Sequence, residues 1–226
     1  MAARMDAEVT EYNCRWASGK YGSSHAGYAP HFVTFMTRAV AARGKSQLRA
    51  LEIGCGDGYF SGHLIRLGCS VCGVDLSPVA VARAAEMYPQ GSFRVHDLAQ
   101  PLPFDADAFD LVWCSEVLEH LFAPLETAKE IARVLKPGGV LLVTVPYHGL
   151  LKNLGIALFA FERHYDPTYP HIRFYTRKSL KGMIEHAGLH VDEIGSCGSN
   201  LGLRDWIVRT NILLRARKPT ASGASA

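Results

Sequence analysis

Hydrophobic positions along the chain fall into two alternating patterns. Short unbroken apolar runs predict buried parallel strands; they lie at residues 50–53, 71–74, 93–95, 109–114, 140–145 and 189–194. Between them, apolar residues recur at every third or fourth position, which predicts helices near residues 28–40, 59–67, 78–87, 124–135 and 179–187. Strands that alternate with helices indicate an α/β fold on one mostly parallel sheet.

Capping and turn residues agree with this division. Gly44 is expected to end the first helix, since glycine is the usual residue just past a helix C-terminus. Ser77 is expected to cap the helix that starts at Pro78. A Pro-Gly turn at residues 137–139 should separate the helix near 124–135 from the next strand.

The most distinctive stretch is Glu52 to Gly58, which directly follows the first predicted strand and has glycine at alternate positions. Strand, glycine turn and helix make the first half of a βαβ unit. Asp75 ends the second strand about 20 residues later, where a Rossmann-type unit places the acid that binds ribose hydroxyls. A nicotinamide-binding fingerprint would need its third glycine at Tyr59.

The spacing Glu-x-Gly-x-Gly-x-Gly from Glu52 instead resembles motif I of the class I S-adenosylmethionine-dependent methyltransferases. The Phe-Asp-Leu-Val strand at residues 109–112, the Glu-Val-Leu-Glu-His run at 116–120 and the Arg-Val-Leu-Lys-Pro-Gly-Gly run at 133–139 also resemble this family. They are similar in particular to its small-molecule branch, including the ubiquinone and menaquinone methyltransferases. The matching pieces cover residues 50–146 almost continuously.

The resemblance implies a Rossmann-like, doubly wound sheet of seven strands, mostly parallel, with an antiparallel last strand near residues 207–216. It implies a single domain over residues 1–218, with an N-terminal helical cap (1–44), a lid insertion (147–175) and a flexible tail (219–226). The insertion is rich in aromatic residues and histidines, which suit either a lid or ordinary packing.

The resemblance also implies S-adenosyl-L-methionine as cofactor. The loop would meet its methionine part, with the acid at position 52 near the ammonium group, and the carboxylate at 97 would accept from the adenine amine. The expected cofactor-binding residues are Glu52, Gly54, Cys55, Gly56, Gly58, Tyr59, Asp75, Leu76, Asp97, Leu98 and Ser115.

Three readings of Glu116, Glu119 and His120 stay open. If the run is helical, the three side chains share one face. In the first interpretation, the two acids simply favour the start of a helix. In the second, His120 is a general base. In the third, the three side chains are ligands for Mg²⁺, since metal dependence is reported for the ubiquinone group that this run resembles. His148, after the fifth strand, competes as the base. We rank His120 first, His148 second and the metal third.

Composition narrows the function further. Lys and Arg number 24 against 21 acids, too mild an excess to indicate a nucleic-acid surface. Six scattered cysteines and a polar N-terminus predict a reduced, cytoplasmic setting, with the thiols of Cys69 and Cys72 in or near the core. The apolar run 154–161 is too short to span a bilayer, although membrane-surface contact stays a lesser alternative.

We therefore expect an S-adenosylmethionine-dependent methyltransferase. Its acceptor should be a small or lipid-like molecule, methylated on oxygen under the lid. An Asn/Asp-Pro-Pro-aromatic run, typical of amine methylation on nucleobases, does not follow the fourth strand. Two alternatives from other classes remain: a nicotinamide-dependent oxidoreductase, and a non-catalytic binding protein on the same fold.

Overall fold

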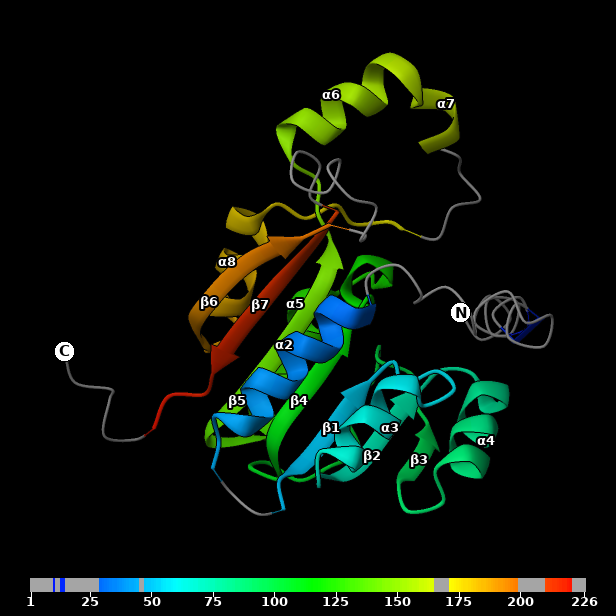
Figure 1. The fold of residues 1–226 in the computed structure, drawn as a ribbon, viewed down its shortest axis with the longest axis vertical. Helices are drawn as coiled ribbons and strands as arrows, with labels where there is room; N and C mark the ends of the chain where they lie inside the picture. The colour runs from blue at the N-terminus through cyan, green and yellow to red at the C-terminus, as the bar shows by residue number, and fades with distance from the viewer. Residues whose placement is uncertain are drawn as a thin grey trace.

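The computed structural model describes residues 10, 13–14, 29–44, 47–164, 171–198 and 210–220 (Figure 1). Its strands are β1 (Arg49–Ile53), β2 (Ser70–Asp75), β3 (Ser92–Val95), β4 (Phe109–Ser115), β5 (Leu135–Pro146), β6 (His190–Cys197) and β7 (Asn211–Arg217). Its helices are α2 (Ala29–Ala41), α3 (Tyr59–Arg66), α4 (Pro78–Met87), α5 (Pro124–Val134), α6 (Leu150–Phe159), α7 (Phe161–His164) and α8 (Arg177–His186), and η1 (Leu118–His120) is a 3-10 turn.

The strands form one seven-stranded sheet in the order β3-β2-β1-β4-β5-β7-β6. The first five strands pair in parallel, whereas β7 is antiparallel to both β5 and β6. This confirms the predicted Rossmann-like sheet. The strand order reverses between β1 and β4. In open α/β sheets, ligands bind at the carboxyl edge beside such a reversal, so we expect the crevice for the cofactor between the loops that follow these two strands.

The core has two halves, one on each face of the sheet. Successive residues of a strand point to opposite faces, so Leu111 and Trp113 pack with Phe32 of α2 and Phe60 of α3. Val112 on the other face packs in the cluster that contains residues of α5 and α8. Because both faces are covered, β4 is a continuous apolar run, and all of its residues except the last are buried.

Capping and turn residues predicted some of the helix and strand boundaries correctly and others not. The side chain of Ser77 accepts a hydrogen bond from the N–H of Ala80 and caps α4, as predicted. The prediction that a Pro-Gly turn separates the helix from the fifth strand was wrong. Strand β5 begins at Leu135, and the turn residues lie within it, where Gly138 has a φ of +74° and the pairing with β4 shifts register. The last strand begins four residues later than predicted, at Asn211.

The insertion between β5 and α8 rises from the carboxyl edge of the sheet, with α6 and α7 at its far end (Figure 1). Its two ends meet in a bridge between Tyr147 and Tyr175. The returning segment is fixed to η1, because the N–H groups of Ile172 and Arg173 both donate to the carbonyl oxygen of Glu119, at 2.9 and 3.0 Å. Residues 165–170 of the insertion, most of the expected N-terminal cap and residues 221–226 of the expected tail lie outside the described residues.

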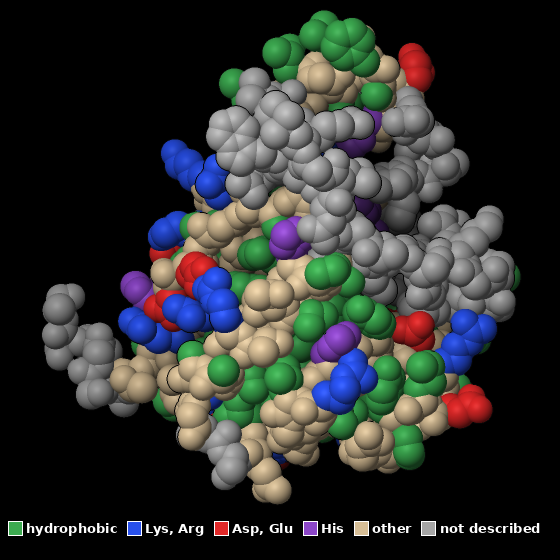
Figure 2. Space-filling view, viewed as in Figure 1, with side chains coloured by type: hydrophobic (Ala, Val, Ile, Leu, Met, Phe, Trp, Pro, Cys, Tyr) green, Lys and Arg blue, Asp and Glu red, His purple; other side chains and the backbone are tan. Residues whose placement is uncertain are grey.

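Two further findings concern the surface. Exposed apolar side chains gather on α6 and α7, at the top of the space-filling view (Figure 2). Among the described residues, no helix combines the length and apolar character needed to cross a membrane.

Candidate functional site

The glycine loop between β1 and α3 places backbone N–H groups at the carboxyl edge. Gly54, Gly56 and Gly58 all have positive φ, at +68°, +52° and +83°. At Gly54 glycine is also needed for space, because a Cβ there would lie 2.4 Å from a methyl carbon of Val117. The loop therefore adopts a backbone that L side chains rarely take, and it leaves bare main chain beside the crevice.

Asp75, at the end of β2, is tied to this loop. Its Oδ2 accepts from the N–H of Gly56 at 2.9 Å, and its Oδ1 accepts from the N–H of Ser77 at 2.9 Å. The carboxylate is buried, and this burial raises its pKa despite the backbone donors. The structure thus joins the two strongest sequence signals, the glycine loop and the acid after the second strand, into one hydrogen-bonded unit.

Glu52 is more deeply buried than we expect for an acid that binds the ammonium group of the cofactor. It is buried within the sheet, and its Oε2 accepts from the hydroxyl of Ser61 in the first turn of α3. Burial raises the pKa of Glu52 to about 8, although the hydrogen bonds from Ser61 oppose the shift. Its contact in the structure is therefore with the start of α3, directly behind the glycine loop.

The other expected cofactor contacts lie around the same edge. Asp97 follows β3, half-buried, and its Oδ1 accepts from the N–H of Ala99 at 2.8 Å. Leu76 and Leu98 are half-buried beside the two acids, and Cys55 is buried in the loop. Tyr59 is partly exposed at the start of α3, with its ring edge-on to Phe60.

Glu116 does not share a helical face with Glu119 and His120, and that expectation was wrong. It precedes η1 with a φ of +54°, and Asn211 of β7 donates to both of its carboxylate oxygens at 3.1 Å. Thr144 of β5 also donates to Glu116 and bonds to the hydroxyl of Ser115. Burial raises the pKa of Glu116 to about 7. This network links the carboxyl ends of β4 and β5 to β7.

Glu119, His120 and His171 come together instead. Oε1 of Glu119 lies 3.9 Å from Nε2 of His120 and 4.0 Å from Nε2 of His171, and the two imidazole centroids are 4.7 Å apart. The side chain of Glu119 is fully buried, and neither of its carboxylate oxygens has a hydrogen-bond partner. Burial, and then the nearby Glu116, raise its pKa well above the usual value.

His148 is the second residue of the insertion and lies near this cluster. Its Nδ1 bonds to Oδ1 of Asn153 at 3.1 Å, and its ring packs against His164 and Phe174. Burial lowers its pKa to about 4, and burial with neighbouring imidazoles lowers that of His171 to about 3. Both rings are therefore neutral near pH 7.

The sequence had separated residues that the fold joins. His171 was noted only as one histidine of the insertion, and Thr144 and Asn211 carried no signal because each belongs to an ordinary strand. Their contacts with Glu119 and Glu116 span 28 to 95 residues of chain. A polar residue near the carboxyl end of an otherwise apolar strand was the one clue to Thr144.

Comparison with known proteins supplies the family. A family profile described as a methyltransferase domain matches residues 26–194. The ubiquinone biosynthesis O-methyltransferase of Xylella fastidiosa (strain M23) is 30% identical over 178 residues, which cover 75% of this chain and 70% of that protein.

Two solved structures show the same fold. A chain of the complex between the Haloferax volcanii Trm112 methyltransferase activator and a methyltransferase aligns with a TM-score of 0.70 at 24% identity, covering 92% of this chain and 98% of that one. The Haemonchus contortus phosphoethanolamine N-methyltransferase 2, solved with S-adenosyl-L-methionine, aligns with a TM-score of 0.61 at 20% identity, covering 82% and 52%.

Proposed function

This chain belongs to the class I S-adenosylmethionine-dependent methyltransferases, and we propose that it methylates an oxygen of a small or lipid-like acceptor beneath the 147–175 insertion. Family membership makes S-adenosylmethionine the cofactor and leaves the nicotinamide oxidoreductase without support. The acceptor, the atom that is methylated and the residues that act on it are the proposal.

We assign the cofactor to the glycine loop and the acids around it. The methionine part would lie against residues 54–58, the ribose hydroxyls at Asp75 and the adenine amine at Asp97, as the sequence suggested. The bond from Gly56 to Asp75 supports this assignment, because it fixes loop and acid relative to each other before any ligand arrives. Ser115 is the last residue of β4, the strand next to β1, and we assign it to the same site.

The observation that carries the acceptor site is the pair of Glu119 and His120 at the end of β4. In the transfer, the carbon–sulfur bond of the sulfonium breaks as the acceptor oxygen bonds to the methyl carbon, and the hydroxyl proton must leave. His120 is partly exposed, with its Nε2 3.9 Å from the buried carboxylate of Glu119. It can take the proton, and Glu119 would stabilise the imidazolium that forms when its own side chain is ionised.

His148 supports this ranking by being a poorer base. Its pKa of about 4 means that it binds a proton weakly at neutral pH, and its ring is already bonded to Asn153. We therefore place His148 in the wall of the acceptor site. The Xylella relative, named as a ubiquinone biosynthesis O-methyltransferase, favours oxygen as the methylated atom.

A second candidate role for the cluster is metal binding, and the donor set decides which metal. Ligand atoms of Glu119, His120 and His171 all lie within 4.8 Å of one another, and the carboxylate oxygens are buried without partners. Two imidazoles suit Zn²⁺, Mn²⁺ or Fe²⁺ better than Mg²⁺, which prefers oxygen ligands. Glu116 is occupied by Asn211 and Thr144. A bound ion would lower the pKa of an acceptor hydroxyl.

The apolar surface of α6 supports a lipid-like acceptor. Leu150, Leu154 and Leu158 follow at intervals of four residues along one side of the helix and are exposed, as are Phe159 at its end and Phe161 at the start of α7. They belong to the exposed apolar side chains at the top of the space-filling view, outside the core (Figure 2). Such a face could meet a hydrophobic acceptor or the surface of the membrane that holds it.

Methyl transfer from labelled S-adenosylmethionine tests the proposal. The protein is incubated with the labelled cofactor and a panel of alkyl-substituted phenols, with matching anilines as the nitrogen control. Label in the phenols supports oxygen transfer. Label only in the anilines contradicts it, and cofactor binding without turnover on either panel favours the non-catalytic alternative.

A further inference from the structure

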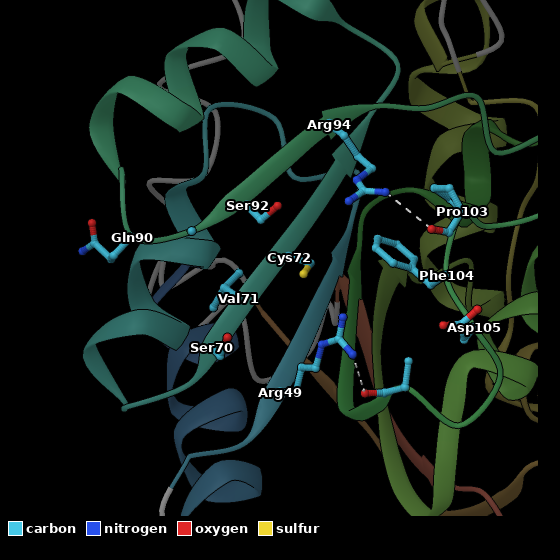
Figure 3. Close-up of a pocket in the computed structure, with 12 residues that line it drawn as sticks. Arg49, Ser70, Val71, Cys72, Gln90, Ser92, Arg94, Pro103, Phe104 and Asp105 are labelled. Carbon is cyan, nitrogen blue, oxygen red and sulfur yellow. Dashed lines mark hydrogen bonds between the residues drawn. The ribbon is translucent and has the colours of Figure 1, made fainter.

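A hollow of about 640 Å³ lies at the amino edge of the sheet, away from the glycine loop (Figure 3). Its walls include the first residues of three neighbouring strands, namely Arg49 of β1, Ser70 of β2 and Ser92 of β3. The glycine loop and Asp75 come at the other ends of these strands. The hollow therefore lies apart from the crevice assigned to the cofactor.

One face of the sheet is polar here, which is unusual for parallel strands. Arg49 pairs with Ser70, and Cys72 with Ser92, so these residues and Arg94 lie on the same face. Farther along that face, Leu51 and Val74 are buried in the core. No helix connects β3 to β4, so residues 96–108 cross as a loop and leave the amino end of this face uncovered. Parallel strands normally have both faces covered by helices.

Aromatic rings hold both arginines in place. The guanidinium of Arg49 lies 4.8 Å from the ring centroid of Phe109, and that of Arg94 lies 5.0 Å from the ring centroid of Phe104. The two rings pack edge to face, with centroids 4.9 Å apart. Each guanidinium also reaches one backbone carbonyl, at the outer limit of 3.5 Å. Stacking thus orients both groups and leaves most of their N–H donors without a close acceptor.

Neither guanidinium makes an ion pair with a carboxylate of the described ranges, in contrast to those of Arg133 and Arg38. Arg133 is paired with Glu130, and Arg38 with Glu193, each at 2.8 Å. Asp105 is the one carboxylate that lines the hollow, and it makes no ion pair with Arg49 or Arg94. The hollow therefore has excess positive charge and donor groups that include two serine hydroxyls and the amide of Gln90.

We propose that this hollow is a second ligand site, which binds a phosphorylated small molecule with at least two anionic groups. A guanidinium presents paired N–H donors that match two oxygens of a phosphate, and serine and amide donors suit the remaining oxygen atoms. The volume lies within the range of sites for small ligands. The half-buried Phe104 and Cys72 provide an apolar floor for the uncharged part of the molecule.

Pyrophosphate is the probe, because it carries two phosphates and no other recognition group. Calorimetry on the full chain at fixed ionic strength should show saturable binding. Arg49→Gln and Arg94→Gln should each weaken it by roughly tenfold or more, since each removes a charge-assisted contact. Arg66→Gln, which changes an exposed arginine of α3, is the matched control and should bind as the wild type does.

Ser92→Asp is the independent variant, because it puts a negative charge in the hollow and keeps both arginines; it should abolish binding. A saturating amount of S-adenosylmethionine should leave pyrophosphate affinity unchanged, since the two ligands occupy opposite edges. Three results would each overturn the proposal: no saturable binding, equal affinity in both arginine variants and the wild type, or displacement of pyrophosphate by S-adenosylmethionine. None of these bears on methyl transfer, so this inference and the proposed function can fail separately.

Discussion

His171 and Glu119, 52 residues apart, meet above the end of β4, with Nε2 of the imidazole 4.0 Å from Oε1 of a fully buried carboxylate. This contact joins the returning end of the insertion to the turn that follows a central strand. It places a group of the proposed lid beside the proposed base, His120. Movement of the lid would therefore change the surroundings of Glu119 directly.

Asp75→Asn should weaken S-adenosylmethionine binding by about tenfold or more. The substitution keeps the size of the side chain and removes the charge from its hydrogen bonds to ribose. The Asn side chain keeps one oxygen acceptor for the N–H groups of Gly56 and Ser77, whereas Asp75→Ala is a less clean test because it leaves both without their acceptor. Calorimetry measures the affinity, with Glu126→Gln on the surface of α5 as control. Equal affinity in Asp75→Asn and the wild type would contradict the ribose assignment.

His120→Ala should lower kcat by roughly a hundredfold or more and keep cofactor affinity, because a general base acts only in the chemical step. EDTA should then have no effect on the wild type. If the cluster binds a metal instead, EDTA should abolish activity and Zn²⁺ or Mn²⁺ should restore it. His171→Ala should then lower kcat as much as His120→Ala does. His186→Ala, an exposed histidine at the end of α8, serves as control.

Glu52→Gln should flatten the loss of stability at alkaline pH. The folded pKa of about 8 lies above the unfolded value of 4.5, so the neutral acid stabilises the fold fully below pH 4.5. This contribution is lost as the pH rises toward 8, because only the unfolded chain has released the proton. Between pH 6.5 and 8.5 the melting temperature of the wild type should fall at least about 3 °C more than that of the variant. Parallel curves would show that Glu52 is already ionised in the fold.

Amide exchange in the 147–175 insertion should be fast in the empty protein and slow down when cofactor and acceptor are both bound. We expect this because α6 exposes most of its apolar side chains and so gains little from packing on the sheet. Hydrogen exchange read by mass spectrometry gives the answer, with β4 as the internal reference. Protection in the empty protein equal to that of β4 would exclude a mobile lid.

Leu154→Glu combined with Leu158→Glu should reduce co-sedimentation with anionic liposomes, because both side chains lie on the exposed face of α6. Met87→Glu is a matched control, since Met87 is also exposed but lies on α4, beside β3. Melting temperatures should stay near that of the wild type in all variants. If the wild type does not bind liposomes, the apolar face of α6 is not a membrane contact.

The sequence alone was enough to predict the sheet, the glycine loop and the position of the acid that follows the second strand. Each of these rests on local information: continuous apolar runs for strands buried on both faces, positive φ for the glycines, and a fixed distance along the βαβ unit for Asp75. A capping serine before a proline likewise placed the start of α4 within its own few residues.

Only the tertiary structure decided which polar groups meet. The helical interpretation of the run 116–120 was wrong for Glu116, which has a positive φ and accepts hydrogen bonds from Asn211 and Thr144. His171 takes its place beside Glu119 because the insertion returns across η1, a path that no local pattern encodes. The hollow at the amino edge also depends on strand register and on the loop that replaces a helix. Contacts between residues far apart in sequence are set by packing of the whole chain, so a one-dimensional pattern could not contain them.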